Sequence, residues 1–83
     1  MKNPYTYEEF EKGVLQKAKK VFSAYPNPQQ AIKDALDSNP HSLRSFYVDI
    51  EHRYENSTDI KEIDEEIFDY LCEDCANILD MMY

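Results

Sequence analysis

The sequence predicts an all-α fold, a single domain of four helices, or five if the residues before the last helix form a separate turn. Apolar residues recur at intervals of three and four along most of the chain, and cap signals separate these stretches. No stretch alternates polar and apolar residues as a half-buried strand does. One glycine and four prolines in 83 residues are typical of helices joined by short connections.

The first helix is predicted to begin after Thr6, because Thr6 and Glu9 have the spacing of a capping box. Pro26 is expected to end it, since the residue before a proline is pushed out of helical geometry. Gly13 lies inside the pattern at a cost of about 1 kcal/mol relative to alanine, which indicates close approach of a neighbouring helix. Its predicted apolar face consists of Phe10, Val14, Ala18, Val21, Phe22 and Tyr25.

The second and third helices share a start signal, an asparagine followed by a proline. Asn27 precedes Pro28 and is followed three residues later by Gln30, and Asn39-Pro40 repeats the asparagine-proline signal. The predicted buried residues are Ala31 or Ile32, Ala35 and Leu36 on the second helix, and Leu43, Phe46, Tyr47, Ile50 and Tyr54 on the third.

The last stretch, residues 58–83, has the longest apolar repeat and carries the whole net charge of −8. Residues 1–58 contain eight acidic and eight basic side chains, and from Asp59 onward nine acidic residues stand against Lys61. Asp64 falls within or beside the apolar face. We therefore expect either one unbroken helix or a helix that Asp64 caps, with Ile60 to Ile63 forming a separate turn. The apolar face consists of Ile60, Ile63, Ile67, Phe68, Leu71, Cys75, Ile78, Leu79 and Met82.

A row of carboxylates lies almost opposite this apolar face and is predicted to face solvent. Like charges three and four residues apart repel by a few tenths of a kcal/mol per pair, and within this segment only Lys61 could offset them. Tyr70 borders the row, and a tyrosine beside charge is a common interface composition. The predicted partner-binding residues are Glu62, Glu66, Asp69, Glu73 and Asp80, with Tyr70 as aromatic anchor and Asp59 and Glu65 at the rim.

Cys72 and Cys75 form the one recognisable short motif, and core packing is the favoured interpretation. The intervening Glu73 and Asp74 disfavour a thiolate, so a redox role is an alternative with little support. A zinc site, the other alternative, needs about four ligands, and only His41 and His52 could complete it, at no familiar spacing. We therefore predict no metal ion and no cofactor.

Nothing in the sequence predicts catalysis. Neither histidine has a nucleophile or base partner fixed beside it. Gly13 is the single glycine, which excludes phosphate-cradling loops, and residues 59–66 lack the central glycine of a calcium loop. The expected protein is not an enzyme.

The composition limits the classes of binding partner and the cellular location that we expect. A net charge of −8 argues against direct binding to nucleic acid or to anionic membranes and favours a basic protein. No apolar run approaches the roughly 18 residues of a membrane span, and the residues from Met1 to Phe10 do not read as a signal peptide. We expect a cytoplasmic protein.

In size, helicity, acidity and surface tyrosine, carried by Asp59 to Asp80 with Tyr70, the chain resembles two groups of small proteins. One is the acidic helical immunity proteins that neutralise bacterial nuclease toxins. The other is the acidic inhibitors that phages and mobile elements carry against restriction or CRISPR nucleases, some of which mimic DNA. The resemblance includes no family motif. The immunity proteins use an adjacent tyrosine pair at their interface, and the predicted third helix of this chain, with Ser45-Phe46-Tyr47, lacks it.

The function we predict is a small acidic binding protein that inhibits a basic, nucleic-acid-processing protein such as a nuclease. Carboxylates one helical turn apart rise about 6 Å per step, similar to phosphates along a nucleic-acid strand. The alternative is a structural or adaptor module, or a homodimer, that binds through its apolar C-terminal end while the acidic face only solubilises it. That end comprises Leu79, Met81, Met82 and Tyr83.

Overall fold

The computed structural model describes residues 4–55 and 63–83, and this part of the chain forms four helices and no strand. The all-α prediction is therefore confirmed. The helices are α1 (Tyr7–Val21), α2 (Pro28–Ser38), α3 (Ser42–Glu55) and α4 (Glu65–Met82), and a 3-10 turn, η1 (Phe22–Ala24), follows α1.

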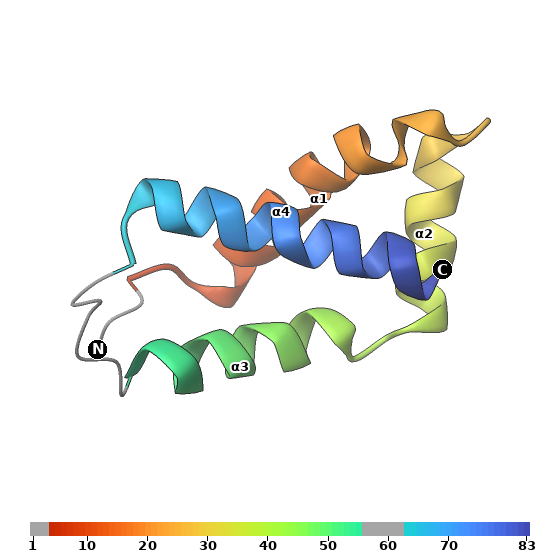
Figure 1. Cartoon of the computed structure of the whole chain (residues 1–83). Coiled ribbons are helices and arrows are strands. Elements are labelled where there is room, and N and C mark those ends of the chain that lie inside the picture. The colour runs from red at the N-terminus through yellow and green to blue at the C-terminus, as the bar shows by residue number, and fades with distance from the viewer. Residues whose placement is uncertain (1–3, 56–62) are drawn as a thin grey trace.

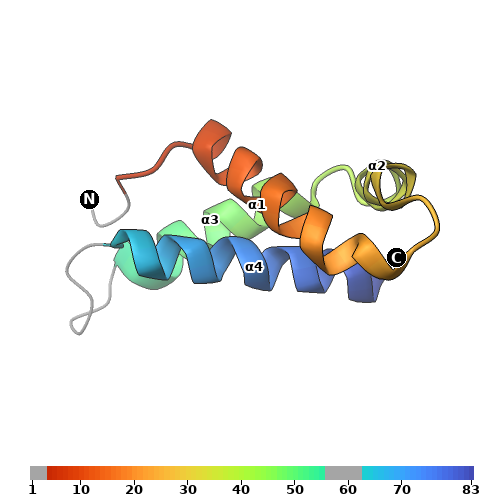
Figure 2. The same ribbon diagram turned by 90° about the horizontal axis from the view of Figure 1, so that it is seen from above.

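Three helices lie lengthwise and the fourth crosses one end of them. α1 and α4 start towards the same end and cross each other obliquely, α3 runs beside α4 in the opposite direction, and α2 crosses their far end (Figures 1 and 2). The molecule measures 43 × 22 × 20 Å. The first turns of α1 and α4 consequently lie at the same end of the molecule.

Three helices begin where the sequence predicts, because a side-chain oxygen accepts a hydrogen bond from the first turn of each. The Glu9 N–H donates to Thr6 Oγ1 at 3.2 Å, and the Glu9 side chain completes the capping box. The Gln30 N–H donates to Asn27 Oδ1 at 3.3 Å. The Ile67 N–H donates to Asp64 Oδ1 at 2.8 Å, so Asp64 caps α4.

Two predicted boundaries differ from the structure. α1 ends at Val21 and continues as a 3-10 turn, so Pro26 follows a turn and not the α-helix itself. Asn39 does not start α3: its side-chain amide donates to the Ala35 carbonyl at 3.0 Å and closes the end of α2. α3 begins two residues after Pro40, at Ser42.

All four helices contribute to one hydrophobic core, and α1 packs closely against α4 at Gly13. A methyl group built on Gly13 would lie 2.5 Å from Cys72 Sγ, which confirms the predicted close approach of a neighbouring helix. Leu79 and both cysteines are buried in this core, while Tyr25, Tyr47 and Tyr54 pack half-buried against it. In the described part of the chain, no helix is long and apolar enough to cross a membrane.

Candidate protein-binding surface

The first turn of α4 presents exposed carboxylates at the end of the molecule where α1 also begins. Glu65 and Glu66 are exposed, and with Asp64 and Asp69 they line a shallow hollow of about 460 Å³. Within residues 4–55 and 63–83 the one ion pair joins Lys17 to Asp69, so Glu65 and Glu66 have no cationic partner there. These two carboxylates are therefore available to a basic molecule.

Asp69 is neutralised by a lysine from α1, which the sequence did not predict. Lys17 Nζ lies 2.9 Å from the Asp69 carboxylate and donates a hydrogen bond to it. The hydrogen bond, helped by the nearby negative charge of Asp69 and Glu73, raises the pKa of Lys17 above its ordinary value. The sequence analysis considered only Lys61 within the same segment, and the structure adds Lys17 from α1, which packs beside this face.

Asp80 does not continue the exposed row. It is half-buried, and Tyr25 Oη donates to its Oδ1 at 2.6 Å. That hydrogen bond raises the pKa of the Tyr25 hydroxyl, because the phenolate would lie against a carboxylate. Asp80 therefore links α4 to the segment after α1. The prediction that Asp80 belongs to the solvent-exposed row of carboxylates is wrong.

Tyr70 is the most exposed aromatic side chain of the described residues, with 67% of its surface accessible. Glu66 precedes it by four residues and Glu73 follows by three, so the three side chains share one side of α4. Both glutamates are exposed. We call the exposed residues Glu65, Glu66, Asp69, Tyr70 and Glu73 the acidic face.

Two of the predicted partner-binding residues, Asp59 and Glu62, lie outside the described residues. Five of the eight are exposed on α4, whereas Asp80 is half-buried and hydrogen-bonded to Tyr25. Their role in binding remains a prediction.

A groove runs between α3 and α4 beside the acidic face, and sequence reasoning missed it. Its volume is about 170 Å³, and two acidic residues and one arginine lie among its apolar side chains. None of these three charged groups forms an ion pair within the described chain. The groove is lined by Phe46, Asp49, Ile50 and Arg53 of α3 and by Leu71, Asp74 and Ile78 of α4. The one sequence signal was Asp74, an acidic residue at the edge of an apolar stripe.

The apolar C-terminal end is divided between core and surface. Met81 is 84% exposed and Met82 about half exposed, whereas Leu79 is buried and unavailable to a partner. The Tyr83 ring packs edge-on against Phe22 and Tyr25, with centroids 6.2 and 5.6 Å away. The exposed apolar surface at this end is therefore smaller than the sequence indicated.

The two thiols lie in a setting that opposes reactivity. Burial raises the pKa of Cys72 to about 11 and that of Cys75 to about 12, with smaller contributions from neighbouring carboxylates. Neither forms a disulfide. Among the described residues, no group of three or more metal-ligating side chains could hold a metal ion.

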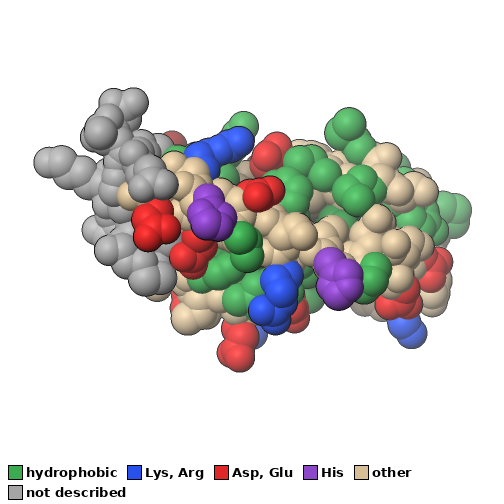
Figure 3. Space-filling model, turned by 90° about the horizontal axis from the view of Figure 1, so that it is seen from below, with side chains coloured by type: hydrophobic (Ala, Val, Ile, Leu, Met, Phe, Trp, Pro, Cys, Tyr) green, Lys and Arg blue, Asp and Glu red, His purple; other side chains and the backbone are tan. Residues whose placement is uncertain are grey.

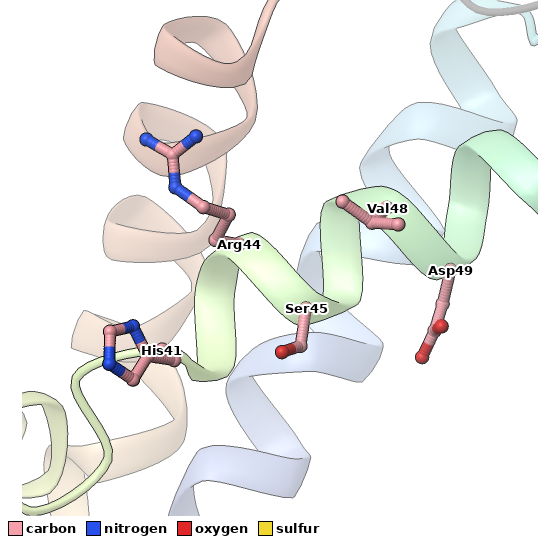
Figure 4. Close-up of a pocket in the computed structure, with 5 residues that line it drawn as sticks. All are labelled: His41, Arg44, Ser45, Val48 and Asp49. Atoms are coloured by element: carbon pink, nitrogen blue, oxygen red, sulfur yellow. The ribbon is translucent and has the colours of Figure 1, made fainter.

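A second hollow, of about 370 Å³, lies on the outer side of α3 and contains the residue types of a hydrolytic triad. His41, Ser45 and Asp49 line it. The Ser45 N–H donates to the His41 carbonyl at 2.9 Å, which is a backbone contact of the helix start, and within the described residues no side-chain hydrogen bond joins any two of the three. Their side chains spread along one side of the helix and do not converge on a common point (Figure 4). A nucleophile needs a base within hydrogen-bond reach, so this hollow offers no catalytic arrangement.

The surface around α3 alternates in character, with apolar patches between acidic and basic side chains (Figure 3). Comparison of the chain with known protein families, with curated proteins and with solved structures gave no match. The acidic face and the adjoining groove are the features from which a function can be argued.

Proposed function

We propose that this protein is a non-enzymatic inhibitor that binds a basic, nucleic-acid-processing protein through the acidic face of α4. The exposure of Tyr70 between Glu66 and Glu73 carries the proposal. Exposing so much of a tyrosine ring has no structural benefit for the monomer, and tyrosine is enriched in protein interfaces.

The charge of the chain supports a basic partner. The net charge is −8, and residues 1–58 contribute none of it. A concentrated negative field accelerates association with a positive surface and opposes association with nucleic acid. A nuclease or other nucleic-acid-binding protein has such a positive surface, because it must hold phosphates.

The length of the row of available carboxylates indicates how the protein would contact its partner. Asp80 is half-buried and hydrogen-bonded to Tyr25, and Asp69 is paired with Lys17. The fully available carboxylates Glu65, Glu66 and Glu73 span nine residues, about 12 Å of helix. A row this short favours docking on one basic patch over imitation of a long stretch of nucleic acid strand. Full DNA mimicry would require further carboxylates.

The test is capture of proteins from the source cell's lysate at low and high salt, with two variants compared to the wild type. Glu66→Lys/Glu73→Lys should abolish capture of the basic partner, whereas Lys19→Glu/Lys20→Glu on α1 changes charge away from the face and should retain it. The captured protein, once purified, should lose nucleic-acid binding or cleavage when the wild-type chain is added. Capture that survives the reversal of Glu66 and Glu73, or a partner that does not act on nucleic acid, would reject the proposal.

The second candidate is an adaptor or homodimer that binds through the C-terminal end, and the exposure of Met81 and Met82 favours it. Substituting both by serine would then abolish binding, and salt would have little effect. The two candidates therefore predict opposite responses to the same pair of measurements.

A further inference from the structure

The groove between α3 and α4 combines an apolar interior with carboxylates on both walls. Asp49 of α3 and Asp74 of α4 line it together with the apolar side chains of Phe46, Ile50 and Ile78. Tyr70 lies four residues before Asp74, one helical turn along α4, so the acidic face and the groove form one continuous surface.

The size of the groove indicates what it can receive. Its volume of about 170 Å³ is smaller than the roughly 300–1,000 Å³ typical of small-molecule sites. At roughly 30 Å³ per water molecule, the space equals about six waters, enough for one long side chain. The groove is thus sized for a single residue of a partner.

The chemistry of the lining selects that residue. A long cationic side chain can lay its methylene stem on apolar surface and keep its charged head at polar groups. Asp49 and Asp74 have no ion pair within the described chain, so each can accept hydrogen bonds from such a head. A guanidinium presents five donors in a planar fork and suits two carboxylates better than an ammonium does.

We propose that this groove receives an arginine side chain from the basic protein partner, with its guanidinium between Asp49 and Asp74 and its stem on Ile50 and Ile78. The inference rests on the proposed function and specifies the partner residue that inserts beside the acidic face. Arg53 lines the same groove and repels the incoming cation, so it limits the affinity.

A second copy of this chain is a poorer occupant. Two molecules of charge −8 repel each other on approach, and the acidic face adjoins the groove. Charge complementarity therefore selects a basic protein.

The probe is a defined helical peptide that carries one central arginine flanked by leucines, with lysines at both ends. A matched peptide has citrulline, which is neutral and of the same shape, in place of that arginine. Each is titrated into the full-length, isotope-labelled protein, and amide chemical shifts are followed. We expect shifts at Ile50, Asp74 and Ile78, and binding of the citrulline peptide weaker by at least about tenfold.

Three variants locate the binding. Asp49→Asn/Asp74→Asn should remove the preference for arginine over citrulline. Glu66→Gln/Glu73→Gln, which removes the same charge from the acidic face, should weaken both peptides while keeping that preference. Arg53→Gln should strengthen arginine binding about two- to fivefold, because it removes a competing cation.

The possible failures are distinct. Shifts confined to Glu66, Tyr70 and Glu73, equal affinity for the two peptides, or no binding of the arginine peptide would each overturn the groove assignment and leave the acidic face as proposed. Concentration-dependent shifts in the groove without peptide would identify a second copy as occupant and also overturn it. If capture of the partner did not depend on charge, the proposed function itself would be rejected.

Discussion

Gly13 is a residue at which α1 packs against α4 with no room for a side chain. Alanine is the better helix former by about 1 kcal/mol, so a glycine here has to be explained by its surroundings. The added methyl group would meet Cys72 Sγ at 2.5 Å and Phe68 at 3.6 Å. The helices cannot approach this closely with any side chain at position 13.

We therefore expect Gly13→Ala to destabilise the protein by about 1–3 kcal/mol, the usual cost of overpacking. The measurement is urea denaturation followed by circular dichroism. Cys72→Ala removes the sulfur that the methyl group would meet, so the double variant should be more stable than the sum of the two single changes predicts. Additive effects would show that the contact with Cys72 is not the cause.

The buried thiols make stability depend on alkaline pH. The folded pKa values of Cys72 and Cys75, about 11 and 12, exceed the ordinary value of 9.0. A group whose pKa is raised by folding stabilises the protein fully below its unfolded pKa, and this contribution falls as pH rises towards the folded pKa. The relevant window therefore opens at about pH 9 and extends to about pH 11 for Cys72 and about pH 12 for Cys75.

Between about pH 7.5 and about pH 9.5 we expect the free energy of unfolding to fall by about 1–2 kcal/mol through these two thiols. The measurement is the urea midpoint at each pH for the wild type and for Cys72→Ala/Cys75→Ala, whose lower overall stability does not affect the comparison of slopes. A variant that loses stability with pH as steeply as the wild type would assign the effect to other groups.

At the scale of the element, the start of α4 combines a hydrogen-bonded cap with negative charge. Asp64 Oδ1 accepts from the Ile67 N–H, and Glu65 and Glu66 follow in the first turn. Carboxylates are favourable at a helix N-terminus because of the helix dipole, although adjacent carboxylates repel one another.

Two substitutions at Asp64 separate these contributions. Asp64→Ala removes both cap and charge and should destabilise the protein by about 1 kcal/mol. Asp64→Ser keeps a capping oxygen and removes only the charge, so we expect its stability to remain close to that of the wild type. Thermal unfolding at low salt measures both, and equal losses in the two variants would mean that the charge matters more than the cap.

Local signals in the sequence determine most helix starts, which is why they could be predicted. Thr6, Asn27 and Asp64 each use a side chain within three residues of the group they cap. Asn39 was misread because an asparagine before a proline can also end the preceding helix, and its bond to the Ala35 carbonyl depends on α2 being complete. The sequence carries both possibilities at this position.

The partners of the acidic residues could not be predicted, since they come from distant parts of the chain. Lys17 and Asp69 are 52 residues apart, and Tyr25 and Asp80 are 55 apart. Helical periodicity assigns residues to the faces of one helix. It does not show which neighbouring helix packs against the edge of a face. The groove between α3 and α4 escaped prediction for the same reason.

At the scale of the whole molecule, the shared direction of α1 and α4 determines where the negative charge gathers. Both helices begin at the same end (Figure 2), so Glu8 and Glu9 of α1 lie at the end that also holds Glu65 and Glu66 of α4. Lys19 and Lys20 lie in the last turn of α1, towards the opposite end. The field is therefore strongest at one end, which would orient a basic partner before contact.

The same field should keep the protein monomeric, which tests the homodimer alternative. We expect the radius of gyration from small-angle scattering at low salt not to grow with concentration, because molecules of charge −8 repel each other. At high salt repulsion is screened, and any dimer formed through Met81 and Met82 would appear as a larger radius. Met81→Ser/Met82→Ser serves as the control, since it removes that apolar surface. A radius that grows with concentration in the wild type but not in this variant would favour the C-terminal end as the interface, over the acidic face.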